Sequence, residues 1–236
     1  MKFNNYNKNE PSSFTYLKKK LDVSVDEFRK SLTEENIDAH SQIKIAKLYA
    51  HRLDTFIKDH LKRKNESILD CGCGLGFIAR ELNKFGGFNI DYCDPSDSVS
   101  DIHRKAFPSE NFFQSDIESL DKFEKKYDII YLREVYPFTR DANFSNQKKL
   151  IDILIHKLRT NGLLIFEQIE NKEDLFVNLR KLNYKFEILS LLPIRFAKKK
   201  FLNKIIFKSN KIQLLLRIVY KLMKKNINHF ILIYQK

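Results

Sequence analysis

The stretch Ser67-Ile68-Leu69-Asp70-Cys71-Gly72-Cys73-Gly74-Leu75-Gly76-Phe77 decides how this chain folds. Its opening residues have the composition of a short buried strand that ends in an acid. Three alternate glycines follow, which permit positive φ angles and a close approach of the backbone to a ligand. A helical pattern begins at Phe77, and the N-terminus of a helix offers unpaired N–H groups to an anionic group. A strand, a Gly-rich turn and a helix in this order predict the ligand site of an open α/β sheet.

The same alternation of strands and helices continues to the end of the chain and predicts a doubly wound α/β fold with a mainly parallel sheet. Helices are expected from about Phe77 to Phe85, over Gln147–Leu158, and after Asn171, which is a suitable N-cap residue. Seven segments are expected to be strands: Ser67–Asp70, Phe88–Cys93, Asn111–Gln114, Asp128–Leu132, Leu163–Glu167, Phe186–Leu192 and Phe230–Tyr234.

Composition excludes several other classes of protein. Hydrophobic residues make up 43% of the 236 residues, which is enough for a core and too many for a disordered chain. The three cysteines are too few for a disulfide framework. The chain has no apolar run of transmembrane length and no apolar stretch of signal-peptide type at its N-terminus, so a cytoplasmic protein is expected.

The positive charge is concentrated in the last part of the chain. The net charge is +13, and twelve basic residues but no acidic residue follow Glu187. This asymmetry indicates an anionic partner: a phosphate-bearing acceptor, an anionic membrane surface or RNA. RNA is the least favoured of the three, because no RNA-binding module is recognisable. A general drift of the composition toward lysine is the alternative explanation.

The segment Asp70–Gly76, D-C-G-C-G-L-G, resembles the acid and G-x-G-x-G motif of the class I S-adenosylmethionine-dependent methyltransferases. Four later segments resemble the further motifs of that family in the same order: Ile90–Ser96, Phe113–Ile117, Lys126–Ile130 and Asn161–Glu167. The resemblance implies a Rossmann-like sheet of seven strands, S-adenosylmethionine as cofactor and S-adenosylhomocysteine as product. The run from Gly74 to Ala79 also matches the dinucleotide fingerprint G-x-G-x-x-A, but Asp70 would repel a pyrophosphate.

Four regions are then expected along the chain. Residues 1–64 form a helical cap, or lid, since apolar residues such as Ile43, Ala46 and Ala50 recur at helical spacing within residues 24–63. Residues 65–194 form the cofactor-binding core, residues 195–226 a basic helical insertion, and residues 227–236 the final strand of the core.

The resemblance also implies which residues hold the cofactor. Asp70 accepts the ammonium group, Asp94 the ribose hydroxyls and Asp116 the adenine amino group. The expected cofactor-binding residues are Asp70, Cys71, Gly72, Gly74, Gly76, Phe77, Asp94, Pro95, Ser96, Asp116, Ile117 and Arg133. No protein-bound metal is expected, because Cys71, Cys73 and Cys93 do not complete a four-ligand set.

The catalytic residues are sought just after the fourth strand. Many relatives that act on small molecules or quinones have E-V-[LI]-E-H there, whereas this chain has Glu134–Phe138, E-V-Y-P-F, with Phe138 in the place of their His. A hydroxyl or protonated nitrogen acceptor needs a base. Tyr136 is the first candidate, Glu134 the second, and His40 could enter from the N-terminal helix. The stretch also lacks the N-P-P-[FY] of nucleobase amino methyltransferases.

The expected function is methyl transfer to an oxygen or nitrogen of a small anionic acceptor, either phosphorylated or glycan-related. Relatives with a lobe between the last two strands commonly modify small molecules, sugars or lipids. This resemblance suggests a role in bacterial surface polysaccharide biosynthesis. The alternatives are an RNA, lipid or quinone methyltransferase and a non-catalytic S-adenosylmethionine-binding partner protein. The acceptor and the oligomeric state stay open.

Overall fold

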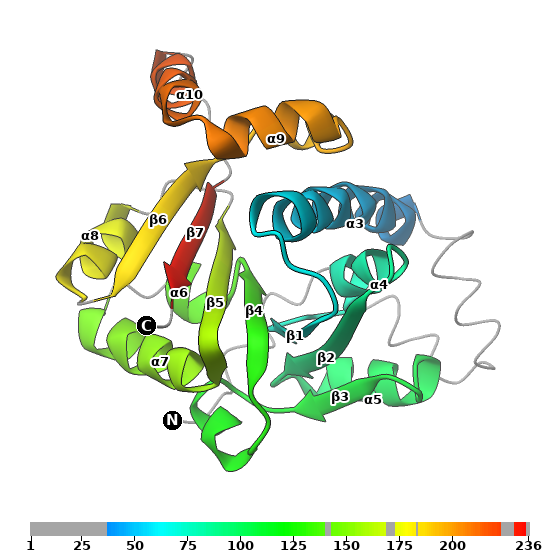
Figure 1. The fold of residues 1–236 in the computed structure, drawn as a ribbon. Coiled ribbons are helices and arrows are strands. Elements are labelled where there is room, and N and C mark those ends of the chain that lie inside the picture. Colours follow the sequence, from blue (N-terminus) through cyan, green and yellow to red (C-terminus); the bar gives the residue numbers. More distant parts are fainter. Residues whose placement is uncertain (1–36, 140–142, 169–172, 183, 223–228, 235–236) are drawn as a thin grey trace.

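A single twisted sheet forms the centre of the computed structural model, which describes residues 37–139, 143–168, 173–182, 184–222 and 229–234 (Figure 1). In that part of the chain seven strands have the order β3-β2-β1-β4-β5-β7-β6. All neighbours are parallel except β7, which runs antiparallel to both β5 and β6. The strands are β1 (Glu66–Cys71), β2 (Phe88–Asp94), β3 (Asn111–Gln114), β4 (Tyr127–Arg133), β5 (Leu158–Gln168), β6 (Lys185–Ser190) and β7 (His229–Tyr234).

Helices cover both faces of the sheet, as the alternating pattern predicts. One face packs on α3 (Ile37–Thr55), the π-helical turn η2 (Phe56–His60), α4 (Phe77–Asn83) and α9 (Lys200–Lys208). The other face packs on η3 (Glu118–Lys122), α6 (Tyr136–Thr139), α7 (Phe144–His156) and α8 (Glu173–Lys181). The central strands β1, β4 and β7 are almost fully buried, and the expected doubly wound α/β fold is confirmed.

The predicted strands all exist, with ends within two residues of the expected ones except at β5. That strand begins at Leu158, because Leu158 already pairs with Tyr127 of β4; the register then shifts before Leu163 pairs with Ile129, and Asn161 lies within this irregular part with a left-handed φ of 62°. The sequence analysis missed α5 (Asp97–Ala106), although Ser96 caps it by accepting from the Val99 N–H at 3.4 Å. Asn171 and residues 1–36 lie outside the described residues.

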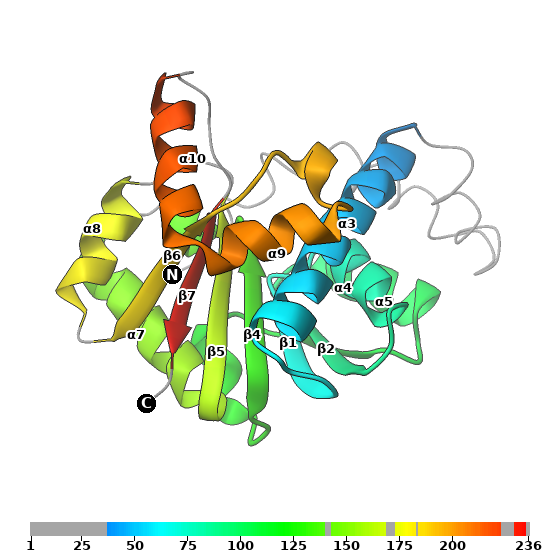
Figure 2. The same ribbon diagram turned by 45° about the horizontal axis from the view of Figure 1, so that its top comes forward.

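The basic insertion between β6 and β7 forms η4 (Ile194–Phe196), α9 and α10 (Asn210–Leu222). In Figures 1 and 2, α9 lies beside α3, and α10 projects beyond the end of β6. Phe207 of α9 packs against Phe56 and Phe230, which attaches α9 to the core. None of the described helices is both long enough and apolar enough to cross a membrane.

One side chain of α10 covers the outer edge of β6. The Gln213 carboxamide accepts from the Ser190 N–H at 2.7 Å and donates to the Ser190 carbonyl at 3.1 Å, so it takes the place of a neighbouring strand. Arg217 caps the Ile188 carbonyl at 2.6 Å. Edge strands expose unpaired backbone groups that invite aggregation, and α10 satisfies them here.

Candidate functional site

The strand order reverses between β1 and β4, and open α/β sheets bind ligands at the carboxyl ends of the strands at this point. Asp70 and Cys71 end β1, Asp94 ends β2, and Arg133 ends β4. The fold therefore brings together residues from two of the predicted motifs and Arg133, which was expected to bind the cofactor.

The Gly-rich turn after β1 depends on its glycines. Gly72, Gly74 and Gly76 have φ angles of 72°, 52° and 67°, in the left-handed region that glycine adopts readily. A Cβ on Gly72 would lie 2.7 Å from Cγ2 of Val135, so the turn also packs tightly on the segment after β4.

The Asp94 carboxylate joins the first two loops of this edge. Its Oδ2 accepts from the Gly74 N–H and its Oδ1 from the Ser96 N–H, both at 3.0 Å. The Gly72 and Cys73 N–H groups donate to the carbonyl of Cys93 at 2.8 and 3.0 Å. These bonds fix the turn against the end of β2.

A cluster around His103, which was not predicted from the sequence, contacts the carbonyl groups of the Gly-rich turn. His103 of α5 stacks on the ring of Phe112, and its Nε2 lies 3.1 Å from the Gly74 carbonyl. Since a carbonyl can only accept, Nε2 carries the hydrogen. Arg80 donates to the Leu75 carbonyl and forms an ion pair of 2.6 Å with Glu110.

Asp70 has the most informative electrostatics of the site. Its side chain is only 5% exposed, and burial, together with the nearby charge of Asp94, raises the pKa of Asp70 to about 7. Arg80 and Arg133 oppose this shift without cancelling it. Burial also raises the pKa of Asp94, against the two backbone hydrogen bonds that it accepts.

Asp70 and Asp94 lie at the same edge of the sheet, and both have raised pKa values. They fit a ligand that brings a positively charged group and hydrogen-bond donors. A cation beside Asp70 would stabilise its charged form, and hydroxyl donors would do the same for Asp94. The residues therefore fit S-adenosylmethionine, which carries an ammonium group, ribose hydroxyls and a sulfonium.

The other expected cofactor residues lie around this centre. Phe77 begins α4, Pro95 is exposed beside Asp94, and Ile117 is buried. Asp116 follows β3, and its Oδ1 accepts from the Ser119 N–H at 2.7 Å, which stabilises η3. The structure places them along the carboxyl edge, and their roles stay predictions.

Beside the acids lies a buried charged network. Glu167 at the end of β5 is fully buried, accepts from the Tyr131 hydroxyl at 2.6 Å, and pairs with Arg52 of α3 at 3.4 Å. Arg52 also donates to the Leu192 carbonyl at 2.6 Å.

Arg133 extends this network toward α3. Its guanidinium lies 4.2 Å from the ring centroid of Tyr49, and its buried Nε finds no hydrogen-bond partner among the described residues. A buried polar group without a partner is uncommon in folded proteins and points to a missing one.

The structure describes the side chains of only some of the candidate bases. Glu134 follows β4 in a left-handed conformation (φ 52°), and its N–H donates to the Glu167 carbonyl at 3.3 Å. Tyr136 lies in α6 and His40 in α3, but their side chains are not among those described. Phe138, which stands where many relatives have His, packs in the core against Phe166 at 4.7 Å.

The three cysteines Cys71, Cys73 and Cys93 are free. No group of three or more His, Cys, Asp or Glu residues that could hold a metal occurs in the described part of the chain. A hydrogen bond with Cys93 and burial raise the pKa of the Cys71 thiol, and burial raises that of Cys73. Protonated thiols are poor ligands and poor nucleophiles.

Known proteins are similar to this chain in sequence or in fold. Residues 41–200 match the family described as methyltransferase domain. The chain is 34% identical over 136 residues to malonyl-[acyl-carrier protein] O-methyltransferase 2 of Ilyobacter polytropus, which is 56% of this chain and 49% of that protein. It is 31% identical over 134 residues to the enzyme of that activity from Halalkalibacterium halodurans, covering 54% of this chain and 47% of that one. The chain thus spans about half the length of the curated relatives it matches.

Among solved structures, the plantazolicin methyltransferase BpumL in complex with a pentazolic desmethylPZN analog and SAH has the same fold. The TM-score is 0.54 at 17% identity, over 96% of this chain and all of that one.

The family match covers more than half of the chain, so this protein belongs to the methyltransferase domain family. The class of enzyme predicted from Asp70–Gly76 is confirmed, and S-adenosylmethionine is confirmed as the cofactor at the level of the family.

Proposed function

We propose that this chain transfers the methyl group of S-adenosylmethionine to a carboxylate oxygen of an acyl group that is carried on an acyl-carrier protein. The named activity of the relatives supports this acceptor class. The observation that carries the proposal is Arg133, a half-buried cation at the end of β4 whose buried Nε finds no hydrogen-bond partner among the described residues. A guanidinium in such a position recognises a carboxylate well.

This acceptor replaces the one expected from the sequence. A phosphorylated or glycan-related molecule was expected from the basic insertion, but the relatives that match are named for a malonyl group. The acceptor remains anionic. The cytoplasmic location expected from the sequence stays part of the proposal.

Within this proposal the cofactor lies along the carboxyl edge of β1, β2 and β3. Asp70 takes its ammonium group, Asp94 its ribose hydroxyls, and Asp116 with Ile117 its adenine. Bound there, S-adenosylmethionine supplies a methyl group on a positively charged sulfur.

A carboxylate acceptor also changes the demands on catalysis. It is already ionised at neutral pH, so no base has to remove a proton from it. The task of the chain is then to hold the acceptor in line and to exclude water. Arg133 orients the carboxylate in this scheme. Tyr136 and Glu134 orient the acceptor in this scheme and need not act as bases.

The test is methyl transfer by the full chain to malonyl-loaded acyl-carrier protein, with the acetyl-loaded form, which lacks a free carboxylate, as control. We expect transfer to the malonyl form alone. At saturating cofactor the rate should be flat between about pH 6.5 and 8.5, since a carboxylate with a pKa near 4 stays ionised there. Absence of transfer to the malonyl form would overturn the acceptor. A rate that rises tenfold per pH unit would instead indicate a hydroxyl acceptor and a base.

Two variants divide the roles. Arg133→Gln should raise KM for the acceptor by about 10-fold or more, as expected for a lost hydrogen bond to a charged group, and leave the affinity for S-adenosylhomocysteine unchanged. Arg159→Gln, at the amino-terminal end of β5, is the matched control. If Arg133→Gln weakens cofactor binding instead, Arg133 belongs to the cofactor site, as first expected. Tyr136→Phe should change turnover by less than about 3-fold, whereas loss of a true base costs about 10²-fold.

A further inference from the structure

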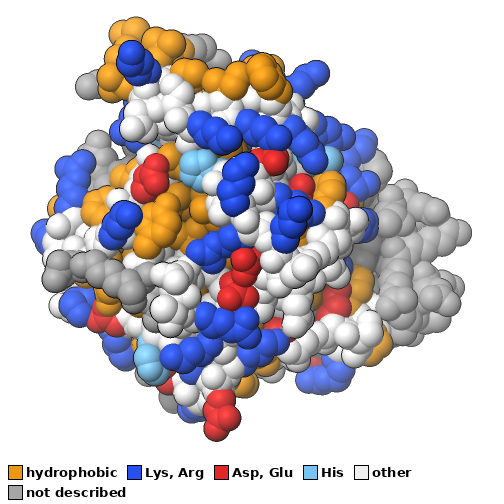
Figure 3. Space-filling model, in the orientation of Figure 1, with side chains coloured by type: hydrophobic (Ala, Val, Ile, Leu, Met, Phe, Trp, Pro, Cys, Tyr) orange, Lys and Arg blue, Asp and Glu red, His pale blue; other side chains and the backbone are white. Residues whose placement is uncertain are grey.

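The two helices of the basic insertion expose a surface that the methyl-transfer reaction does not explain. Phe201 of α9 is 72% exposed and Leu222 of α10 is 78% exposed. Hydrophobic side chains cover α10 and the outer side of α9 at the top of Figure 3. We call this the apolar ridge, formed by Phe201, Leu202, Leu214, Leu215, Ile218, Val219 and Leu222, all of them exposed.

Contacts within the fold fix the orientation of the ridge. On α10 its members recur with helical spacing from Leu214 to Leu222 and form one continuous face. The opposite face carries Gln213 and Arg217, which bind the edge of β6. These bonds fix the rotation of α10, so its apolar face must point to solvent.

Cations flank the ridge. Lys and Arg side chains form a row directly beneath the apolar side chains of α9 in Figure 3. Lys200 pairs with Asp54 at 3.7 Å and Lys204 with Asp59 at 3.1 Å, which attaches α9 to α3 and η2. Lys198 and Lys199 are exposed next to the start of α9.

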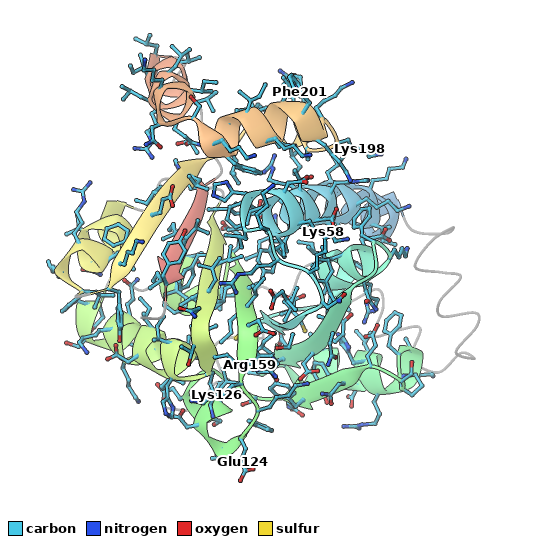
Figure 4. The ribbon with its side chains drawn as sticks, viewed as in Figure 1. Lys58, Glu124, Lys126, Arg159, Lys198 and Phe201 are labelled. Atoms are coloured by element: carbon cyan, nitrogen blue, oxygen red, sulfur yellow. The ribbon has the colours of Figure 1, made fainter. Side chains whose placement is uncertain are left out.

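The view with side chains gives the direction of both groups. In Figure 4, Phe201 points away from the sheet, and Lys198 lies beside the start of α9. Apolar side chains thus form the outermost layer, and the cations lie one step closer to the body of the protein. This is the arrangement of an amphipathic helix in the interface of a membrane.

We propose that the apolar ridge and its flanking lysines dock this protein on an anionic lipid surface. Monomeric soluble proteins rarely expose a contiguous apolar patch of this kind without a use for it. Twelve basic and no acidic residues after Glu187 match negatively charged headgroups. The ridge projects outward, so it can enter a fluid interface without a complementary groove. A second copy of this chain would bring the same positive charges and repel the first.

The inference is independent of the acceptor, because it rests on α9 and α10 and on no residue of the proposed site. If the acceptor proposal fails, lipid binding is still expected.

The experiment is sedimentation of the full chain with vesicles of phosphatidylcholine alone and of phosphatidylcholine mixed with phosphatidylglycerol. We expect binding to the anionic vesicles only. Binding should weaken as salt rises from about 0.1 to 1 M, where the screening length falls from about 10 to 3 Å. Phe201→Ser combined with Leu215→Ser should lower the affinity about 10-fold or more, since both side chains lose burial in the interface. Lys198→Gln combined with Lys199→Gln should also lower it about 10-fold.

Matched controls separate a local effect from a general one. Val177→Ser changes an exposed apolar residue of α8. Lys122→Gln combined with Lys126→Gln removes two exposed charges, and Lys126 lies at the end of the molecule opposite α9 in Figure 4. Both controls should bind vesicles like the unchanged chain, and all variants should keep their melting temperature.

Three results would overturn the proposal. One is no binding to anionic vesicles at low salt. Another is a concentration-dependent dimer that the Phe201 and Leu215 substitutions dissociate, which would assign the ridge to a second copy. The third is binding of purified acyl-carrier protein that is lost in the same variants while vesicles are ignored, which would assign it to a protein partner.

Discussion

The affinity for S-adenosylhomocysteine should depend on pH through Asp70. With a pKa of about 7, this carboxyl is about one-tenth ionised at pH 6 and about nine-tenths at pH 8. Only the ionised form stabilises an ammonium group, so the affinity should fall about 10-fold, or about 1.4 kcal/mol, from pH 8 to pH 6. Calorimetric titration at constant ionic strength measures it. Asp70→Asn should bind weakly at both pH values and show no such slope.

The same carboxyl should make the chain without its cofactor less stable at high pH. Its pKa in the folded chain is raised above the value near 4 of the unfolded chain, so the fold favours the protonated form. Stability from this group is present at low pH and is lost as pH rises through about 7. Asp70→Asn should therefore raise the free energy of unfolding at pH 8 by about 2–4 kcal/mol, and do little at pH 4.

Urea denaturation at the two pH values checks this, and Asp101→Asn on the exposed side of α5 is the matched control. The reasoning is refuted if the affinity for S-adenosylhomocysteine is flat between pH 6 and 8. It is also refuted if Asp70→Asn keeps the pH slope of the unchanged chain, because another group would then control binding.

Three further changes test the cofactor edge and the packing of α10 on β6. Asp94→Ala should weaken calorimetric binding of S-adenosylhomocysteine by about 1.5–3 kcal/mol, as for a lost hydrogen bond to a charged group; an unchanged affinity would contradict the ribose role. Gly72→Ala should lower the melting temperature, because the left-handed φ costs an alanine about 1–2 kcal/mol and its Cβ meets Val135. A second substitution, Val135→Ala, should recover only the stability lost through this contact and not the stability lost through φ. Gln213→Leu should cost about 2–4 kcal/mol in urea denaturation, since it leaves the buried Ser190 N–H and carbonyl unpaired; a loss under 0.5 kcal/mol would show that water replaces the carboxamide.

Local signals made the sheet and the cofactor edge predictable. The strands are short apolar runs between turns. Asp70 and Asp94 lie at the ends of two of them and Asp116 follows a third, so chain order fixed their place at one edge. The helix α5 was also within reach, because Ser96 followed by Asp97 is a helix-start pattern.

Contacts between distant residues were not predictable in this way. His103 meets the carbonyl of Gly74 across 29 positions, and Arg52 meets Glu167 across 115. No periodicity or spacing links such pairs, because the tertiary packing alone brings them together. The sequence predicted an anionic membrane surface as one of three partners of the basic part of the chain, whereas the outward direction of the apolar ridge depends on the bonds of Gln213 to β6.

The position of Arg52 has a consequence for the timing of turnover. One guanidinium joins α3 to the end of β5 and to the Leu192 carbonyl after β6. An outward movement of α3 would separate Arg52 from Glu167. Breaking such a buried ion pair costs about 3–5 kcal/mol. The opened form would then be populated only about once in 10² to 10⁴ molecules. If each product had to leave past α3, that fraction would limit the rate of release. The helix is therefore held in place at Arg52, and we expect substrate and product to exchange by a route that does not require α3 to move.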